Sequence, residues 1–142
     1  MKKEQELKTT EFNPFLYEDN RFMKMLNNYN KFGNLVIGVD FDFTLNDPVT
    51  KETYLDIVLL IKELNNLNFK ICIWTANEDR EYVEDTWDEH GLKWECYNYS
   101  PINPGSMKPH FNILLDDSAG LNESVELCWR IVNYLKEQKC KN

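Results

Sequence analysis

The sequence has few basic residues and no long apolar run. Lysine and arginine number 16 against 24 aspartate and glutamate, which gives the 142 residues a formal charge of −8. Sequence-independent binding to nucleic acid needs a basic surface, so we do not expect it of a chain this acidic. No apolar run approaches the length that spans a bilayer, and we therefore expect no membrane association.

The chain also lacks paired cysteines and the pattern of a secretory leader. Its four cysteines, Cys72, Cys96, Cys128 and Cys140, form no C-x-x-C pair, so we expect no zinc site. Reduced thiols are typical of the cytoplasm, where we expect the protein to reside. Residues 1–12 are charged and contain no apolar core of a signal peptide.

What the chain does contain is enough apolar material for one folded domain. Hydrophobic residues make up 42% of the sequence and aromatic residues 13%, as in globular proteins of this size. We interpret residues 1–34 as an N-terminal extension with a helix over 20–32, which Gly33 would end. Residues 35–142 then form the principal domain.

Within the principal domain, apolar runs alternate with segments of helical periodicity. Continuous apolar runs predict strands at 35–39, 70–74, 95–99 and 111–115, of which 95–99 is the weakest. Apolar stripes predict helices over 51–67, from a cap at Asn77 to Gly91, and over 122–138. This alternation predicts an α/β fold, a Rossmann-like parallel sheet with helices on both faces.

Polar residues follow three of these strands at the point where each strand ends. Asp40 and Asp42 follow the first strand, Thr75 the second, and Asp116 and Asp117 the last. Because ligands of such sheets bind beyond the carboxyl ends of the strands, we expect these five residues to meet at one edge.

Carboxylates gathered in this way need a partner. Two unit charges about 4 Å apart repel by roughly 4 kcal/mol at an effective dielectric near 20. A cation among the acids, or a proton on one of them, would relieve the repulsion. A site of oxygen ligands alone suits Mg²⁺, which shares its shell with substrate phosphate. The sequence therefore predicts a magnesium site that acts on a phosphorylated substrate.

The motifs resemble, in kind and in order, those of the haloacid dehalogenase-like (HAD) phosphohydrolases. "DFDFT" (40–44) is similar to their D-x-D-x-T motif, and "ICIWT" (71–75) to their strand ending in Thr or Ser. Lys108 is placed like their third-motif lysine, and "NILLDD" (112–117) resembles their strand that ends in paired acids. The resemblance implies that residues 35–142 are a HAD-like catalytic domain.

The resemblance also implies a role for each acid. Asp40 would be the nucleophile that forms an aspartyl-phosphate, and Asp42 the general acid and base. Mg²⁺ would be held by Asp40, by the backbone carbonyl of Asp42 and by Asp116, with Asp117 as a direct or water-bridged ligand. The implied activity is Mg²⁺-dependent hydrolysis of a phosphate monoester.

Four further positions carry expectations. The resemblance implies that Thr75 and Lys108 hold the phosphoryl oxygens. We expect Thr44 to brace the loop by hydrogen bonding rather than to take part in chemistry. Phe43 stands where the family commonly has glycine, and because phenylalanine adopts a positive φ only at a cost, we expect ordinary backbone there.

The motif spacing leaves no room for an inserted cap domain. Only 35 residues separate Asp40 from Thr75, and 33 separate Thr75 from Lys108. The chain thus resembles the cap-less members of the family. Without a cap the site should admit sizeable phosphate esters, such as nucleotides, sugar phosphates or phosphorylated polymers, and an oligomer could help to cover it.

Two other classes of function fit parts of the pattern. A catalytically silent HAD-like relative would bind phosphate or a partner protein, although both acids of the D-x-D motif are intact here. A receiver-like signalling domain also combines a parallel sheet with acids, Thr and Lys. Its paired acids come early in the chain, whereas here the D-x-D motif comes first and the D-D pair last, which disfavours that class.

Overall fold

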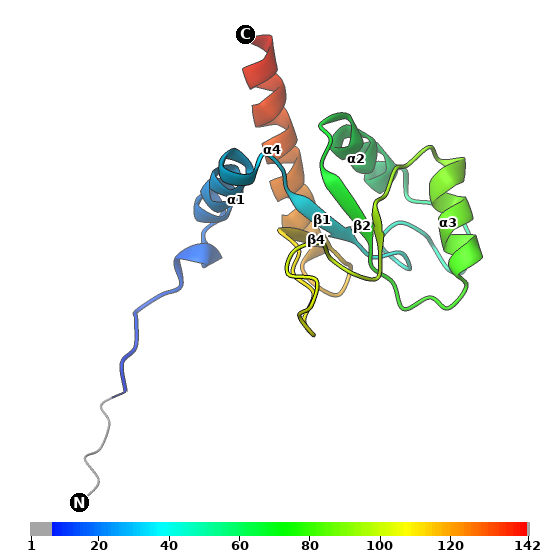
Figure 1. Ribbon diagram of the computed structural model, residues 1–142, viewed down its shortest axis with the longest axis horizontal. Coiled ribbons are helices and arrows are strands. Elements are labelled where there is room, and N and C mark those ends of the chain that lie inside the picture. Colours follow the sequence, from blue (N-terminus) through cyan, green and yellow to red (C-terminus); the bar gives the residue numbers. More distant parts are fainter. Residues whose placement is uncertain (1–6, 142) are drawn as a thin grey trace, which may run out of the picture.

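A four-stranded parallel sheet lies at the centre of the computed structural model, which describes residues 7–141 (Figure 1). Its strands are β1 (Val36–Val39), β2 (Lys70–Ile73), β3 (Cys96–Tyr97) and β4 (Ile113–Leu115). They lie in the order β3-β2-β1-β4, and each neighbouring pair is parallel. The prediction of an α/β fold with a parallel sheet is confirmed.

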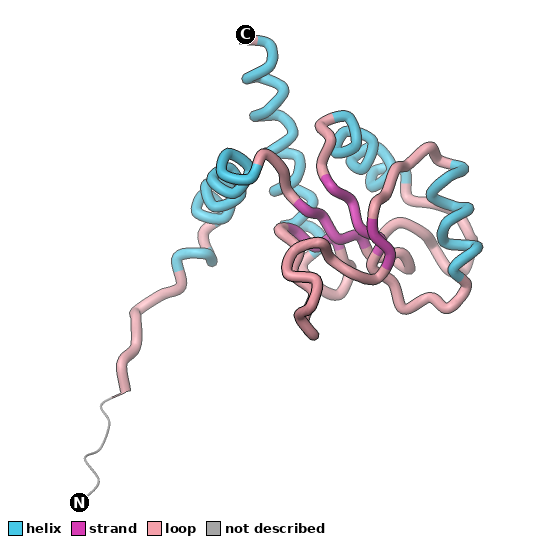
Figure 2. Tube along the Cα trace, viewed as in Figure 1, coloured by secondary structure: helices cyan, strands magenta, loops and turns pink. Residues whose placement is uncertain are grey.

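The helices occupy the intervals where the apolar stripes predicted them (Figure 2). They are α1 (Glu18–Phe32), α2 (Leu55–Asn66), α3 (Arg80–Glu89) and α4 (Leu121–Cys140), and a short 3-10 turn, η1 (Pro14–Leu16), precedes them. Among residues 7–141, no helix combines the length and the apolar composition needed to cross a membrane.

Two of these helices begin later than their stripes suggest. Helix α2 begins at Leu55 because the preceding residues form a turn, in which the carboxylate of Asp47 accepts the N–H of Val49 at 2.9 Å. Helix α3 is capped by Asp79, whose carboxylate accepts the N–H of Tyr82. The prediction that Asn77 caps this helix is therefore wrong.

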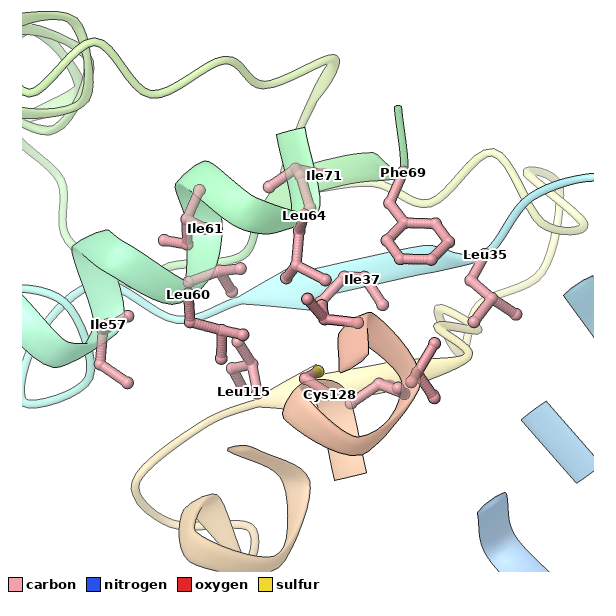
Figure 3. Close-up of a cluster of buried hydrophobic side chains, with 14 of the residues drawn as sticks. Leu35, Ile37, Ile57, Leu60, Ile61, Leu64, Phe69, Ile71, Leu115 and Cys128 are labelled. Carbon is pink, nitrogen blue, oxygen red and sulfur yellow. The ribbon is translucent and has the colours of Figure 1, made fainter. Parts of the chain in front are cut away.

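One face of the sheet packs against the helices and forms the main core (Figure 3). Every second strand residue points to this face, where it meets buried side chains of α2 and α4. The strand residues concerned are Ile37, Val39, Ile71, Ile73, Ile113 and Leu115. Side chains of α1 and α3, including the fully buried Trp87, join the same cluster.

The other face is covered by a loop and not by a helix. Here Val36, Cys72 and Cys96 form a second buried cluster with Ile102 and Phe111. Both covering residues belong to the segment 98–112, which we term the return loop because it connects β3 back to β4 (yellow in Figure 1). The expectation of helices on both faces is therefore wrong for the part of the chain that the structure describes.

The strand order explains this arrangement. The connections β1–α2–β2 and β2–α3–β3 both run in one direction across the sheet, whereas the connection from β3 to β4 runs back. Because parallel crossovers are right-handed, helices α2 and α3 share one face and the return loop lies on the opposite face. The return loop contains Pro101, Pro104, Gly105 and Pro109, which oppose helix formation.

The return loop sits directly on the backbone of β1. The ring of Phe111 lies where a side chain at Gly38 would stand, since an added Cβ would be 2.8 Å from Cγ of Phe111. We expect Gly38→Ala to lower the free energy of unfolding by about 1–3 kcal/mol, because overpacking outweighs the smaller gain from restricting the unfolded chain. Urea unfolding measures the change.

The control for this prediction is Gly38→Ala in a protein whose residue 111 has a smaller side chain. In a Phe111→Leu background, Gly38→Ala should cost much less, so that the double variant is more stable than the sum of the single changes implies. Equal stability of Gly38→Ala and the unsubstituted protein would show that the loop moves aside freely.

Candidate metal and phosphate site

Three carboxylates from two strands gather at the carboxyl edge of the sheet. Asp40 follows β1, and Asp116 and Asp117 follow β4, the strand paired with β1. The N–H of Asp40 donates to the carbonyl of Leu115 at 2.8 Å, which carries the pairing one residue beyond the strand. Carboxylate oxygens of the three acids lie within 4.8 Å of one another. We refer to these three residues as the acid cluster.

Thr44 ties the two halves of the acid cluster together. Its buried hydroxyl accepts the N–H of Asp117 at 2.9 Å. The same hydroxyl lies 3.2 Å from Oδ2 of Asp40 and 3.3 Å from Oδ1 of Asp117, and its single proton can be donated to one of them at a time. Thr44 thus braces the loop by hydrogen bonding, as its place in the motif suggested.

The protonation of Asp40 reflects its crowded surroundings. The pKa of Asp40 is raised to about 7, chiefly by burial, which disfavours a charged carboxylate. The hydrogen bond with the side chain of Asp117 and the charge of Asp116 contribute to this increase, and neighbouring hydrogen-bond donors oppose it in smaller measure. Without a cation the acid cluster therefore favours keeping a proton.

The turn that follows β1 is tightly wound and holds a strained residue. The carbonyl of Phe41 accepts backbone N–H groups from Leu45 and Asn46 at 2.9 Å, and the N–H of Phe43 donates to the carbonyl of Asn46 at 2.8 Å. To close this turn Phe43 adopts φ of 64°, although 55% of it is exposed. The expectation of ordinary backbone at Phe43 is wrong. The left-handed conformation costs about 1–2 kcal/mol, and it persists because the buried residues after Phe43 fix the turn.

Asp42 lies outside the acid cluster. Its two carboxylate oxygens lie 3.4 and 3.3 Å from Nδ2 of Asn77, which donates to them. Asn77 in turn accepts the N–H of Asp79 and so joins the loop after β2 to the start of α3. The side chain of Asp42 is therefore oriented by an amide and is free of the contacts that hold Asp40.

Thr75 lies two residues beyond the end of β2, in the same loop as Asn77, the residue that contacts Asp42. Its N–H donates to Oδ1 of Asn98 at 2.7 Å, and its hydroxyl oxygen accepts the N–H of Asn77 at 3.0 Å. The proton of that hydroxyl remains available to another acceptor, since the oxygen acts here only as an acceptor.

Lys108 stands apart from these residues. Its side chain is exposed in the return loop, and it forms no ion pair with any residue of the described range 7–141. Its N–H donates to the hydroxyl of Ser106, which holds the backbone of the loop and leaves the ammonium group in solvent.

The donor set of the acid cluster fits a hard divalent cation. The ligands on offer are carboxylate oxygens, and no cysteine or histidine joins them among residues 7–141. Oxygen-only sites of this kind suit Mg²⁺, Ca²⁺ or Mn²⁺ over softer metals. Asp40 and Asp116 are half-buried and Asp117 is exposed, so one side of such a site would face solvent.

Three residues lie near the site in roles that the sequence did not predict. Asn77 and Asn98 act through side-chain hydrogen bonds to other loops, for which the sequence carries no local signal. Trp74 ends the apolar run 70–74 that predicted a strand, and it is only half-buried. Trp74 comes directly after β2 and directly before Thr75. That position is the only feature of the sequence that indicated a place at the border of the site.

Comparison with known proteins identifies no relative: no family model, no curated protein and no solved structure matches this chain.

Proposed function

We propose that this protein is a Mg²⁺-dependent phosphatase of the HAD-like type without a cap domain, acting on a phosphate monoester. The observation that carries the proposal is the junction of two separate motifs in one oxygen-only cluster: Asp40 from the tip of β1 with Asp116 and Asp117 from the tip of β4. Residues 35–142 would form the catalytic domain, and we place its action in the cytoplasm.

Asp40 would act as the nucleophile. Its carboxylate oxygen attacks phosphorus, the bond from phosphorus to the ester oxygen breaks, and an aspartyl-phosphate forms at Asp40. Asp42 gives a proton to the departing ester oxygen. Asp42 then takes a proton from water, the water oxygen attacks phosphorus, and the bond to the Asp40 carboxylate breaks to release inorganic phosphate.

The remaining residues would position these groups. Asn77 holds the carboxylate of Asp42, so that it points in one direction while it exchanges a proton. The free hydroxyl proton of Thr75 is suited to a phosphoryl oxygen, and Lys108 would supply a positive charge from the return loop. Mg²⁺ held by Asp40, Asp116, Asp117 and the backbone carbonyl of Asp42 would neutralise phosphate charge.

The separate roles of Asp40 as nucleophile and Asp42 as proton donor and acceptor give a specific test. With p-nitrophenyl phosphate, whose leaving group departs without a proton, Asp42→Asn should release one p-nitrophenolate per protein in a rapid burst. Steady turnover should then fall by roughly 10²–10⁴, the usual contribution of a general acid–base group. Stopped-flow absorbance measures the burst, and intact-protein mass spectrometry detects phosphoryl-Asp40.

The outcomes of this experiment separate the candidate functions. Absence of a burst together with unimpaired turnover in Asp42→Asn would contradict the role of Asp42. If the unsubstituted protein hydrolyses no phosphate ester of any class yet binds inorganic phosphate in the presence of Mg²⁺, the alternative of a catalytically silent phosphate-binding protein is supported instead.

A further inference from the structure

Residues from the adjacent strands extend the row that begins with the acid cluster at the carboxyl edge of the sheet. Beyond the paired residues Val39 and Ile73, the N–H of Trp74 donates to the carbonyl of Val39 at 2.9 Å, as that of Asp40 does to Leu115. The N–H of Asn98 donates to the carbonyl of Ile73 at 2.8 Å. Trp74 is therefore the neighbour of Asp40 on the β2 side, about one strand spacing of 4.8 Å away.

Trp74 points to the face covered by the return loop. Its indole meets the ring of Phe111 edge-on, with centroids 5.7 Å apart and planes at 62°. Phe111 is itself part of the buried cluster on that face. This contact holds one edge of the indole and fixes the direction in which its remaining surface faces.

A hollow of about 110 Å³ opens beside the indole. Its walls come from Trp74 at the end of β2 and from the return loop, and the residues with the largest side chains are Trp74, Tyr99, Ile102 and Met107. None of its ten lining residues is charged, although charged residues make up 28% of the chain. We refer to it as the Trp74 hollow.

The walls of the Trp74 hollow are anchored at their base and open at their rim. The hydroxyl of Ser100 donates to the carbonyl of His110, and Ile102 pairs with His110 across the loop. Tyr99 is 53% exposed and Met107 fully exposed, so both present apolar surface that the chain itself does not cover.

We propose that the Trp74 hollow binds the leaving group of the substrate, and that this group is a single uncharged planar ring. The proposal rests on the phosphatase function, because Trp74, which lines the hollow, is the neighbour across the sheet of Asp40, the residue that would attack the phosphate. The substrate class is then an aryl phosphate, with its ring against the indole and its phosphate at the acid cluster.

Size and chemistry select this class over the alternatives. The hollow is smaller than the cavity of about 150 Å³ that encloses benzene, so it covers part of one ring, with the rest at its open rim, and has no room for a fused pair. A charged leaving group would find no counter-ion on these walls, whereas aromatic faces gain about 0.5–1.5 kcal/mol from an aromatic partner beyond buried area. A planar ring without charge fits both conditions.

Non-hydrolysable phosphonates test the proposal by binding alone. In the presence of Mg²⁺, we expect phenylphosphonate to bind the unsubstituted protein at least about tenfold more tightly than methylphosphonate, with cyclohexylphosphonate between them. Trp74→Leu should reduce the preference for phenyl over methyl to about threefold or less and leave methylphosphonate binding unchanged. Isothermal titration calorimetry measures each Kd.

Trp94→Leu is the matched control, because Trp94 is also half-buried but packs against Tyr97 and the main core. This variant should keep the full preference for the phenyl ligand. Tyr99→Ala provides a second test at an exposed position where folding is not at risk, and it should also lower the preference.

The binding results distinguish a wrong assignment of the hollow from a wrong assignment of the phosphatase function. Equal binding of phenyl- and methylphosphonate, or an undiminished preference in both Trp74→Leu and Tyr99→Ala, overturns the hollow and leaves the function standing. If no phosphonate binds, phenol is titrated while the Trp74 indole N–H is followed by NMR. A phenol-induced shift of that signal supports the hollow without the function, and its absence overturns the hollow as well.

Discussion

Replacing Asp40 with asparagine should abolish the hydrolysis of phosphate monoesters while the protein remains folded. The amide has nearly the shape of the carboxylate, but it is a very poor nucleophile and a weaker ligand for a cation. We expect the rate with p-nitrophenyl phosphate and Mg²⁺ to fall by a factor of at least about 10³, as for other residues that carry covalent catalysis. Initial rates at saturating substrate measure the loss.

The fold should tolerate this substitution because no structural contact depends on the charge of Asp40. Its N–H bond to Leu115 is retained, and one of three mutually repelling acids is removed. Thermal unfolding followed by circular dichroism checks this expectation. Asp85→Asn, at an exposed position of α3, is the matched control and should keep full activity. Comparable rates in Asp40→Asn and the unsubstituted protein would exclude Asp40 as nucleophile.

The parallel sheet could be predicted because its signals are local and redundant. The runs around β1, β2 and β4 are apolar at consecutive positions, which marks strands covered on both faces. Their ends carry the acids, so the rule for parallel sheets was sufficient to expect Asp40, Asp116 and Asp117 together. The structure does bring these three together, within 4.8 Å.

The second face of the sheet could not be predicted, since it depends on strand order. Alternating strands and helices are compatible with helices on both faces, and only the order β3-β2-β1-β4 assigns the return loop to a face of its own. The composition of residues 98–112 indicated a loop. It did not indicate that Ile102 and Phe111 would cover a sheet face in place of a helix.

The details of the site depend on long-range hydrogen bonds. Asn77 was interpreted as a helix cap because asparagine is common there, but its amide lies against Asp42, 35 residues away in sequence. Phe43 adopts a left-handed conformation against its intrinsic preference because buried neighbours determine the turn. In both cases tertiary contacts outweigh a local preference of about 1 kcal/mol.

The second large effect expected is the dependence of both activity and stability on Mg²⁺. Hydrolysis should stop when a chelator is added and return when Mg²⁺ is restored in excess. Because the cation binds only where the folded chain gathers its acids, Mg²⁺ at 100 times its Kd should stabilise the protein by about 2.7 kcal/mol. For a chain of this length that corresponds to an increase in Tm of roughly 5–10 °C. Differential scanning calorimetry with and without Mg²⁺ measures the shift independently of any substrate.

The variant Asp116→Asn should be more stable than the unsubstituted protein without Mg²⁺ and less stable than it with Mg²⁺. In chelator it removes one of the crowded charges at the half-buried edge, so the variant should be more stable than the unsubstituted protein. In Mg²⁺ it lacks a ligand, so most of the increase in Tm should disappear and the unsubstituted protein should be the more stable of the two. Asp88→Asn, exposed on α3, serves as control and should follow the unsubstituted protein in both conditions. A Tm that is indifferent to Mg²⁺, or an Asp116→Asn variant that is less stable in chelator as well, would show that the three acids are held together by the fold for a reason other than a cation.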